Sequence, residues 1–149
     1  MEYTQGTMGR IFVARIDHGE DVLKSLIELS KKEQISCAYF MMLGAVGSAK
    51  LVTGPKEKHI PPDVEWAEFS DARELIGAGN IVWMDDAPKI HLHAAIGGTA
   101  GVLMGCVRDN TEAFMVVEVI IFEIEGINIV RRFNDVLGFN QMIFVEGQG

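Results

Sequence analysis

The chain has little that would tie it to a membrane or to an oxidising compartment. It contains only two cysteines in 149 residues, Cys37 and Cys106, and both lie in apolar segments. No apolar run reaches the roughly 18 residues that a membrane span requires. Residues 1–8 also lack the basic start and apolar stretch of a signal peptide. We therefore expect no membrane partner, a cytoplasmic location and two reduced thiols that serve as core residues.

Basic residues are also scarce. The 13 Lys and Arg stand against 21 Asp and Glu, which gives a formal net charge of −8 at pH 7. The sequence pI is about 4.9, whereas domains that bind nucleic acid alone usually have a basic patch and a pI above about 9. The adjacent pairs Lys31-Lys32 and Arg131-Arg132 are interpreted as a helix C-terminus and a solvated strand end. We expect no direct nucleic-acid binding.

Apolar residues, by contrast, are plentiful, at 48% of the sequence. A length of 149 residues matches the usual size of one domain. No linker or internal repeat divides the chain. We predict a single domain over residues 1–149, with an ordered core of about 9–145.

Hydrophobic periodicity predicts one long helix. Apolar residues recur at helical spacing from Val22 to Leu29, directly after Asp17-His-Gly-Glu-Asp21. Glu20 and Asp21 fall in the expected first turn and Lys31-Lys32 in the last, which is the charge order that complements the helix dipole.

The rest of the chain is typical of strands and turns. Residues 44–47 are interpreted as a tight break or a bulge between two strands, 54–62 as a surface loop and 70–75 as a short turn. The pattern predicts an α+β domain with the helix packed on a mostly antiparallel sheet of about seven to eight strands. The expected strands are residues 10–16, 36–43, 48–53, 64–69, 79–84, 89–96, 102–108 and 113–125.

Two of the four histidines, His91 and His93, stand two apart in the predicted strand 89–96. Strand side chains alternate faces, so both imidazoles share one face, with Cα atoms roughly 6.6 Å apart. Imidazole is the commonest metal ligand and titrates near neutral pH, which makes this face a candidate for a divalent metal or an anion. Zinc needs at least three protein ligands. The alternative is two histidines hydrogen-bonded at a subunit interface or on the surface.

Arg108 and Glu118 are further candidates for the same site. If strands 89–96 and 102–108 pair, Arg108 and the histidines face one cleft, and a guanidinium binds carboxylate or phosphate through a bidentate fork. The alternative is that Arg108 ends its strand in solvent or pairs with Glu112. Glu118 lies in the middle of an apolar run, where an unpaired carboxylate is costly. We therefore expect Arg108 or a histidine as its partner.

Other motifs do not support catalysis. Gly97-Gly-Thr-Ala-Gly101 is rich in glycine, but it lacks the Lys-Ser/Thr of a P-loop and opens no predicted helix. Neither cysteine has an activating neighbour in the sequence, and no Ser–His–Asp order can be argued.

The order of the motifs resembles one known family. Gly-Glu-Asp opens the helix, and Leu43-Gly-Ala-Val46, His-Leu-His-Ala94 and a glycine-containing strand follow before Glu118-Val-Ile-Ile and Gly126. Over roughly residues 9–133 this order is similar to that of the plant- and prokaryote-conserved (PPC) domain. That domain of unknown function follows AT-hook segments in plants and stands alone in prokaryotes. The resemblance implies a mostly antiparallel sheet with a packed helix, assembled as a homotrimer.

The resemblance also bears on metal binding. Many members pair the His-x-His strand with a third histidine on the next strand, and the matching position here is Val102, which cannot bind metal. Zinc or another divalent metal at His91 and His93 would then need a carboxylate, or His18 or His59 from another subunit. A small anion is favoured over a metal as the ligand, and no cofactor is expected.

The sequence therefore predicts a stand-alone PPC-like protein that serves as a trimeric ligand-binding or assembly module. Its expected site consists of His91, His93, Arg108 and Glu118. Two alternatives stay open. The first is a transcription-associated protein that reaches DNA through a basic partner. The second is a metal-dependent enzyme that uses the histidine strand.

Overall fold

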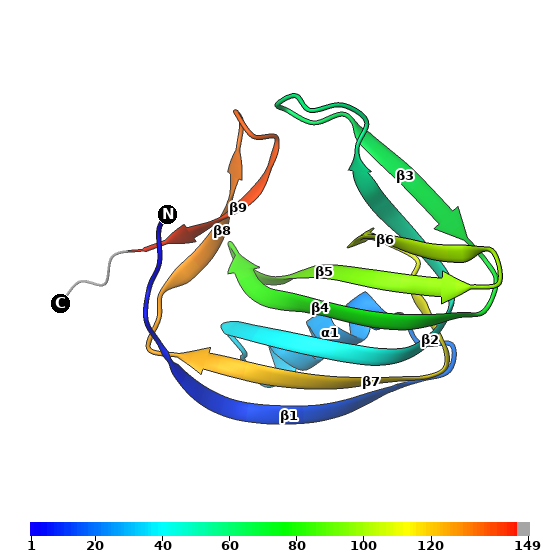
Figure 1. Ribbon diagram of the computed structural model, residues 1–149. Coiled ribbons are helices and arrows are strands. Elements are labelled where there is room, and N and C mark those ends of the chain that lie inside the picture. The colour runs from blue at the N-terminus through cyan, green and yellow to red at the C-terminus, as the bar shows by residue number, and fades with distance from the viewer. Residues whose placement is uncertain (146–149) are drawn as a thin grey trace.

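A computed structural model describes residues 1–145 of the chain (Figure 1). In these residues seven strands form one sheet, and β8 and β9 form a second, small one. All the strand pairings are antiparallel, which confirms the predicted α+β fold with one main helix. The elements are β1 (Thr7–Asp17), α1 (Val22–Lys32), β2 (Cys37–Pro55), β3 (Val64–Phe69), β4 (Arg73–Met84), β5 (Ala87–Gly98), β6 (Gly101–Val107), β7 (Glu112–Glu125), β8 (Ile129–Asn134) and β9 (Phe139–Phe144).

Strand β2 is the centre of the large sheet because it pairs with four other strands. Its first half lies between β7 and β4, so that Phe40 stands opposite both Ile121 and Gly79. Its second half pairs with β3 and, at Val52, with the end of β6. The spatial order is β1-β7-β2-β4-β5-β6, and the return of β6 to β2 curls the sheet. Gly105 permits this return, because a side chain there would collide with the Val52 carbonyl group.

The helix covers one face of the sheet. It begins at Val22, where the Asp21 carboxylate accepts a hydrogen bond of 2.9 Å from the backbone N–H of Lys24. The predicted helix is confirmed, but neither acidic residue lies in its first turn: Asp21 is the N-cap and Glu20 precedes it. Val22 and Leu26 are buried in the hydrophobic core that the helix shares with the sheet. No helix in residues 1–145 is long and apolar enough to cross a membrane.

One ion pair, Arg10–Glu123, lies at the edge of the helix-covered face. Glu123 on β7 is 6% exposed, and its carboxylate accepts hydrogen bonds from Nε of Arg10 at 2.6 Å and from Nη2 at 2.9 Å. Nη2 also donates to the carbonyl of Glu33, just after α1. The pair therefore ties the end of the helix to β1 and β7. The hydrogen bonds from Arg10 lower the pKa of Glu123, although burial opposes this shift.

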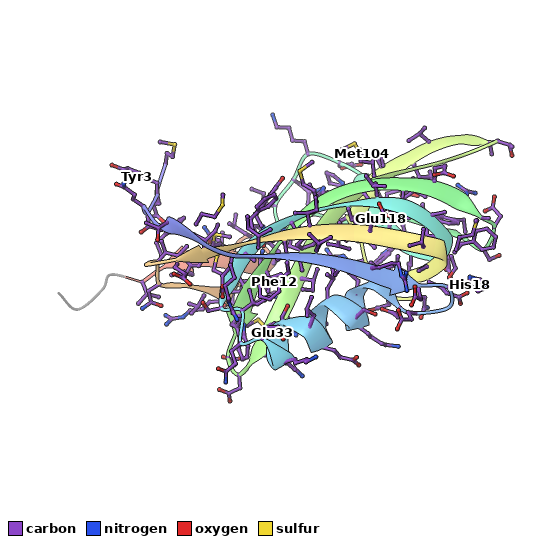
Figure 2. All side chains as sticks on the ribbon, turned by 90° about the horizontal axis from the view of Figure 1, so that it is seen from below. Tyr3, Phe12, His18, Glu33, Met104 and Glu118 are labelled. Carbon is purple, nitrogen blue, oxygen red and sulfur yellow. The ribbon has the colours of Figure 1, made fainter. Side chains whose placement is uncertain are left out.

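The opposite face of the sheet carries large apolar side chains that stay exposed within residues 1–145. In Figure 2, Met104 and Glu118 point away from α1, whereas Phe12 lies on the side of the helix. The register places these side chains in neighbouring rows across β1, β7, β2 and β4. We call this surface the open face; its exposed apolar residues are Ile11, Val13, Tyr39, Met41, Leu43, Ile76 and Ile120.

The small sheet is a hairpin that stands beside the main sheet and contacts β4 (Figure 1). The sequence prediction had no strands at 129–134 or 139–144. The structure differs at two other places. Residues 44–47 continue β2 without a break, although the register with β7 shifts there, as the predicted bulge implies, and β4 begins at Arg73, inside the predicted turn. In both segments pairing with a neighbouring strand outweighs the local turn preference of the sequence, as β4 pairs with β2 from Arg73 to Val82.

Candidate metal centre and the adjoining cleft

Cross-strand register brings three metal-ligating side chains together. His91 and His93 lie on the face of β5 opposite that of buried Leu92, as the alternation predicts. His93 stands directly opposite Cys106 on β6. The Nε2 atoms of the two histidines are 3.1 Å apart, and the ligand atoms of all three residues lie within 4.8 Å of one another. Cys106 is therefore a candidate for the third ligand.

The spacing of these atoms fits a tetrahedral transition metal. With Zn–N distances of about 2.0–2.1 Å, two imidazole nitrogens on one zinc ion are about 3.3–3.4 Å apart. The pair at 3.1 Å is already close to that separation. Two imidazoles and one thiolate would leave the fourth position of a tetrahedral metal free. This ligand set suits zinc and the other metals that accept imidazole and thiolate together.

The protonation of the ligands also bears on metal binding. Burial, aided by the positive charge of Arg131, lowers the pKa of His91 to about 4, so this imidazole is neutral at neutral pH. A neutral imidazole has the lone pair that a metal needs. Burial raises the pKa of the Cys106 thiol, although Arg108 and Arg131 oppose that shift. Metal binding at this cysteine therefore releases a proton.

The position that matches the third histidine of the family is Val102, and it is not the position of Cys106. Val102 stands opposite Gly97 near the start of β6 and is 70% exposed. It is four residues from Cys106, which faces His93. Val102 therefore offers no ligand, as expected, and the sequence analysis did not consider Cys106, a candidate ligand at the far end of β6.

A cleft adjoins the metal-ligating group beside the β8–β9 hairpin. Its volume is about 490 Å³, and we call it the hairpin cleft. It is lined by side chains from α1, from the part of β5 that β6 does not cover, from the end of β6 and from the hairpin. Its cationic side chains are Lys89, Arg108 and Arg131, and Asp109 is its only carboxylate among the described residues.

Arg131 is the unusual member of this cleft. It is 8% exposed, and its guanidinium donates to two neutral acceptors, the Asn140 carbonyl at 2.9 Å and Asn80 Oδ1 at 2.6 Å. Its Nε–H has no hydrogen-bond partner, and within residues 1–145 no carboxylate lies within ion-pair distance. A buried guanidinium without a counter-charge is costly.

The structure separates the four residues of the sequence-predicted site. His91 and Arg108 line the hairpin cleft together, and His93 lies beside His91. Arg108 forms no ion pair with Glu112 or with any other carboxylate in the described part of the chain. The predicted proximity of Glu118 is wrong. This residue is exposed on β7, with β2 and β4 between it and the histidine strand, and it lines a hollow of about 430 Å³ on the open face.

Two residues of the site were missed in the sequence. Cys106 was interpreted as a core residue and Arg131 as part of a solvated strand end. The alternation of residues 102–108 gives the faces of the strand, but only the register shows that Cys106 is opposite His93. No local signal marks Arg131, because its environment is set by Asn80, 51 residues away in the sequence.

The fold and the site together define a class of protein: an α+β domain with a curled antiparallel sheet, one helix and a metal-competent His-x-His strand. The chain belongs to the Plants and Prokaryotes Conserved (PCC) domain family, whose model matches residues 3–125. This confirms the resemblance drawn from the motifs. A search of curated proteins finds no match.

Solved structures agree with this assignment. A metal-containing protein from Archaeoglobus fulgidus has 24% identity and a TM-score of 0.83, over 98% of this chain and 100% of that one. A PPC protein from Pyrococcus horikoshii has 25% identity and a TM-score of 0.82, over 99% of each chain. A protein from Bacteroides thetaiotaomicron, named as a candidate DNA-binding protein, has 22% identity and a TM-score of 0.78, over 95% of this chain and 99% of that one.

Proposed function

We propose that this protein is a metal-binding module that assembles with copies of itself. His91, His93 and Cys106 would hold a divalent transition metal, with zinc as the first candidate. The observation that carries this proposal is the grouping of two imidazole nitrogens and one thiol sulfur within 4.8 Å. The metal-containing relative from Archaeoglobus fulgidus, which shares the fold, gives independent support.

The ligand set also limits what the metal could do. A bound metal with three protein ligands would supply a Lewis acid with one position free for a small ligand. His93 is exposed, so that position is accessible from solvent in the isolated chain. Cys106, at 7% exposure, is held in place by backbone pairing to β5 and β2. This arrangement serves binding of a metal and of a small ligand on it.

Self-assembly accounts for the open face. Monomeric soluble proteins rarely expose contiguous apolar patches of more than a few hundred Å², and here apolar side chains run across four adjacent strands. Covering them with further copies of the chain would remove this surface from water. The open face continues along β4 toward the histidines of β5, so the metal centre would lie close to the boundary between subunits. The family resemblance favours three copies.

The proposed metal centre is tested by metal analysis of protein purified without a histidine tag. We expect about one zinc per chain after loading, and a cobalt-substituted protein with a thiolate-to-cobalt absorption band. Cys106→Ser should abolish the band and His91→Ala should reduce the metal content. Cys37→Ser removes the other buried cysteine and serves as the matched control. Binding that is unchanged by Cys106→Ser would contradict the proposal.

Assembly is tested by light scattering coupled to size-exclusion chromatography. We expect a mass of about 49 kDa, which is three times the 16.4 kDa of the chain. Met41→Glu places a charge at the centre of the open face and should lower the mass to that of one chain. Glu28→Lys, on the outer side of α1, is a control that should keep the wild-type mass. A single-chain mass for the wild-type protein would refute self-assembly.

Direct DNA binding remains disfavoured, although the relative from Bacteroides thetaiotaomicron is named as a candidate DNA-binding protein. The net charge of −8 gives little counterion release on contact with phosphates. We expect no mobility shift of duplex DNA at about 150 mM salt, where non-specific affinities are already weak. Tight binding that weakens steeply with added salt would overturn this expectation.

A further inference from the structure

We propose that the hairpin cleft binds a small organic molecule with two negative charges, whose anionic group lies at the Arg131 side of the cleft. This ligand site goes beyond the proposed metal centre and requires no bound metal. The two sites share only His91, which belongs to the metal-ligating group and also lines the cleft.

The first argument is the unmatched charge of Arg131. A guanidinium has five N–H donors, and the two hydrogen bonds of this one go to a carbonyl and an amide oxygen, neither of which carries charge. These contacts hold the group in place but leave its charge uncompensated. In the Arg10–Glu123 pair, by comparison, the buried charged group, Glu123, has a partner of opposite charge. An oxyanion in the cleft would provide what Arg131 lacks.

The second argument is the charge balance of the cleft. Lys89, Arg108 and Arg131 give three positive charges against the single negative charge of Asp109. The net value of +2, obtained as three minus one, matches a ligand with two negative charges better than a monoanion. Phosphate monoesters carry about −1.5 to −2 at pH 7, and dicarboxylates carry a similar charge. Both chemistries meet the same requirement.

The third argument is the size and the apolar wall of the cleft. A volume of about 490 Å³ falls within the roughly 300–1,000 Å³ that is usual for small-molecule sites. Phe133 and Phe139, which flank the hairpin turn, line the cleft and are exposed. The ligand therefore needs an apolar body as well as charge. The tip of the hairpin also touches the loop between β2 and β3, because a Cβ on Gly138 would lie 2.7 Å from Cβ of Pro61.

The proposal is tested by calorimetric titration of the full chain after chelator treatment, with four probes. Phenyl phosphate and phthalate each combine a ring with two charges, and their relative affinities distinguish a phosphate from a dicarboxylate site. Benzoate has the ring with one charge, and inorganic phosphate has the charge without a ring. We expect either or both of the first two probes to bind more tightly than the last two. No binding of phenyl phosphate or phthalate at millimolar concentration would overturn the proposal.

Variants then locate the ligand. Removing one partner of a buried, hydrogen-bonded charge pair usually weakens binding by well over tenfold, so Arg131→Met should weaken the better dianion by at least about tenfold. Arg132→Met removes the exposed neighbour and is the matched control. Arg108→Gln changes an exposed residue at the end of β6, and a weakening of about two- to fivefold would follow even if Arg131→Met failed to fold. Wild-type affinity in both Arg131→Met and Arg108→Gln would contradict the proposal.

The Cys106→Ser protein separates this site from the metal centre. We expect it to bind the dianion with wild-type affinity, because the ligand contacts the cleft and not the metal. If the dianion binds only to zinc-loaded wild-type protein, it is a metal ligand, and the cleft proposal fails while the metal proposal stands. If Cys106→Ser binds the dianion but the wild-type protein takes up no zinc, the cleft proposal stands and the metal proposal fails.

Discussion

The two faces of the main sheet differ in the burial of their apolar side chains and in the pairing of their charged side chains. On the face that α1 covers, the side chains are buried, and the charged residue Glu123 has a partner in Arg10. On the other face, apolar side chains lie exposed, three metal-ligating side chains stand together, and Arg131 has no counter-charge within residues 1–145. The first face is stabilised by contacts within one chain. The second suits further components, which we propose to be copies of the chain, a metal and an anion.

This difference separates stability from function within one sheet. Leu92 points into the core while its neighbours His91 and His93 point the other way. A single strand therefore contributes to the core with one side and to the site with the other. The rigid core behind it fixes the positions of the two imidazoles, which is the preorganisation that a metal site needs.

The largest expected effect comes from a change in the covered face. Leu92 is fully buried, and Leu92→Ala should lower the free energy of unfolding by about 2–5 kcal/mol. Met41→Ala, on the open face, where Met41 is 52% exposed, is the matched control. We expect it to change the unfolding free energy little when the protein is dilute enough to be a single chain. Urea denaturation measures the unfolding free energy of both variants. An equal decrease in the two would contradict the difference that we draw between the faces.

An intermediate effect is expected when the metal is removed. A ligand present at 100 times its Kd stabilises the folded state by about 2.7 kcal/mol, which corresponds to roughly 5–10 °C in Tm for a chain of this size. Zinc loading should raise the Tm of wild-type and Cys37→Ser protein by such an amount and leave that of Cys106→Ser unchanged. Differential scanning calorimetry with and without a chelator measures this. A zinc-dependent rise in Cys106→Ser would place the metal elsewhere.

The smallest expected effect concerns the dependence of stability on pH at the charged pair. Because hydrogen bonds from Arg10 lower the pKa of Glu123 in the folded state, its stabilising contribution is present above the unfolded glutamate pKa of about 4.3. The contribution is lost as the pH falls through the lower folded value. Glu123→Gln should therefore be less stable than the wild type near pH 7, with a difference that shrinks below about pH 4.

Urea midpoints between pH 3 and pH 7 test this prediction. Glu118→Gln removes an exposed carboxylate from the open face and serves as the control. A difference between Glu123→Gln and the wild type that stays constant over this range would show that the Arg10–Glu123 pair does not couple folding to proton binding.

The sequence predicted the features that depend on local periodicity. The helix at 22–32 and most strands of the large sheet follow from the spacing of apolar residues, and the common face of His91 and His93 follows from the period of two. The hairpin of β8 and β9 was missed. Its strands are short, and its position depends on the contact of Arg131 with Asn80 on β4.

The composition of the site was harder to predict because it depends on register. The face of a strand can be deduced from its own sequence, but its neighbours cannot. Glu118 lies on the same side of the sheet as the histidines and is still separated from them by two strands. Cys106 stands next to His93 only because β6 pairs with β5 in the register that puts Gly105 opposite Ala94. The family resemblance gave the fold and the histidine strand, but its third histidine position matches Val102, and it gave no indication of Cys106.

The pairing of β1 with β7 has a consequence for synthesis of the chain. Met8 stands opposite Ile124, so the two paired residues are 116 positions apart in the sequence (124 minus 8). At translation rates of roughly 5–20 residues per second, β1 would wait about 6–23 s for its neighbour to be made. During this time Phe12 and Ile16 lack the sheet against which they pack. The nascent chain is therefore most prone to aggregation before β7 leaves the ribosome, and a chaperone that binds this N-terminal segment would act in that interval.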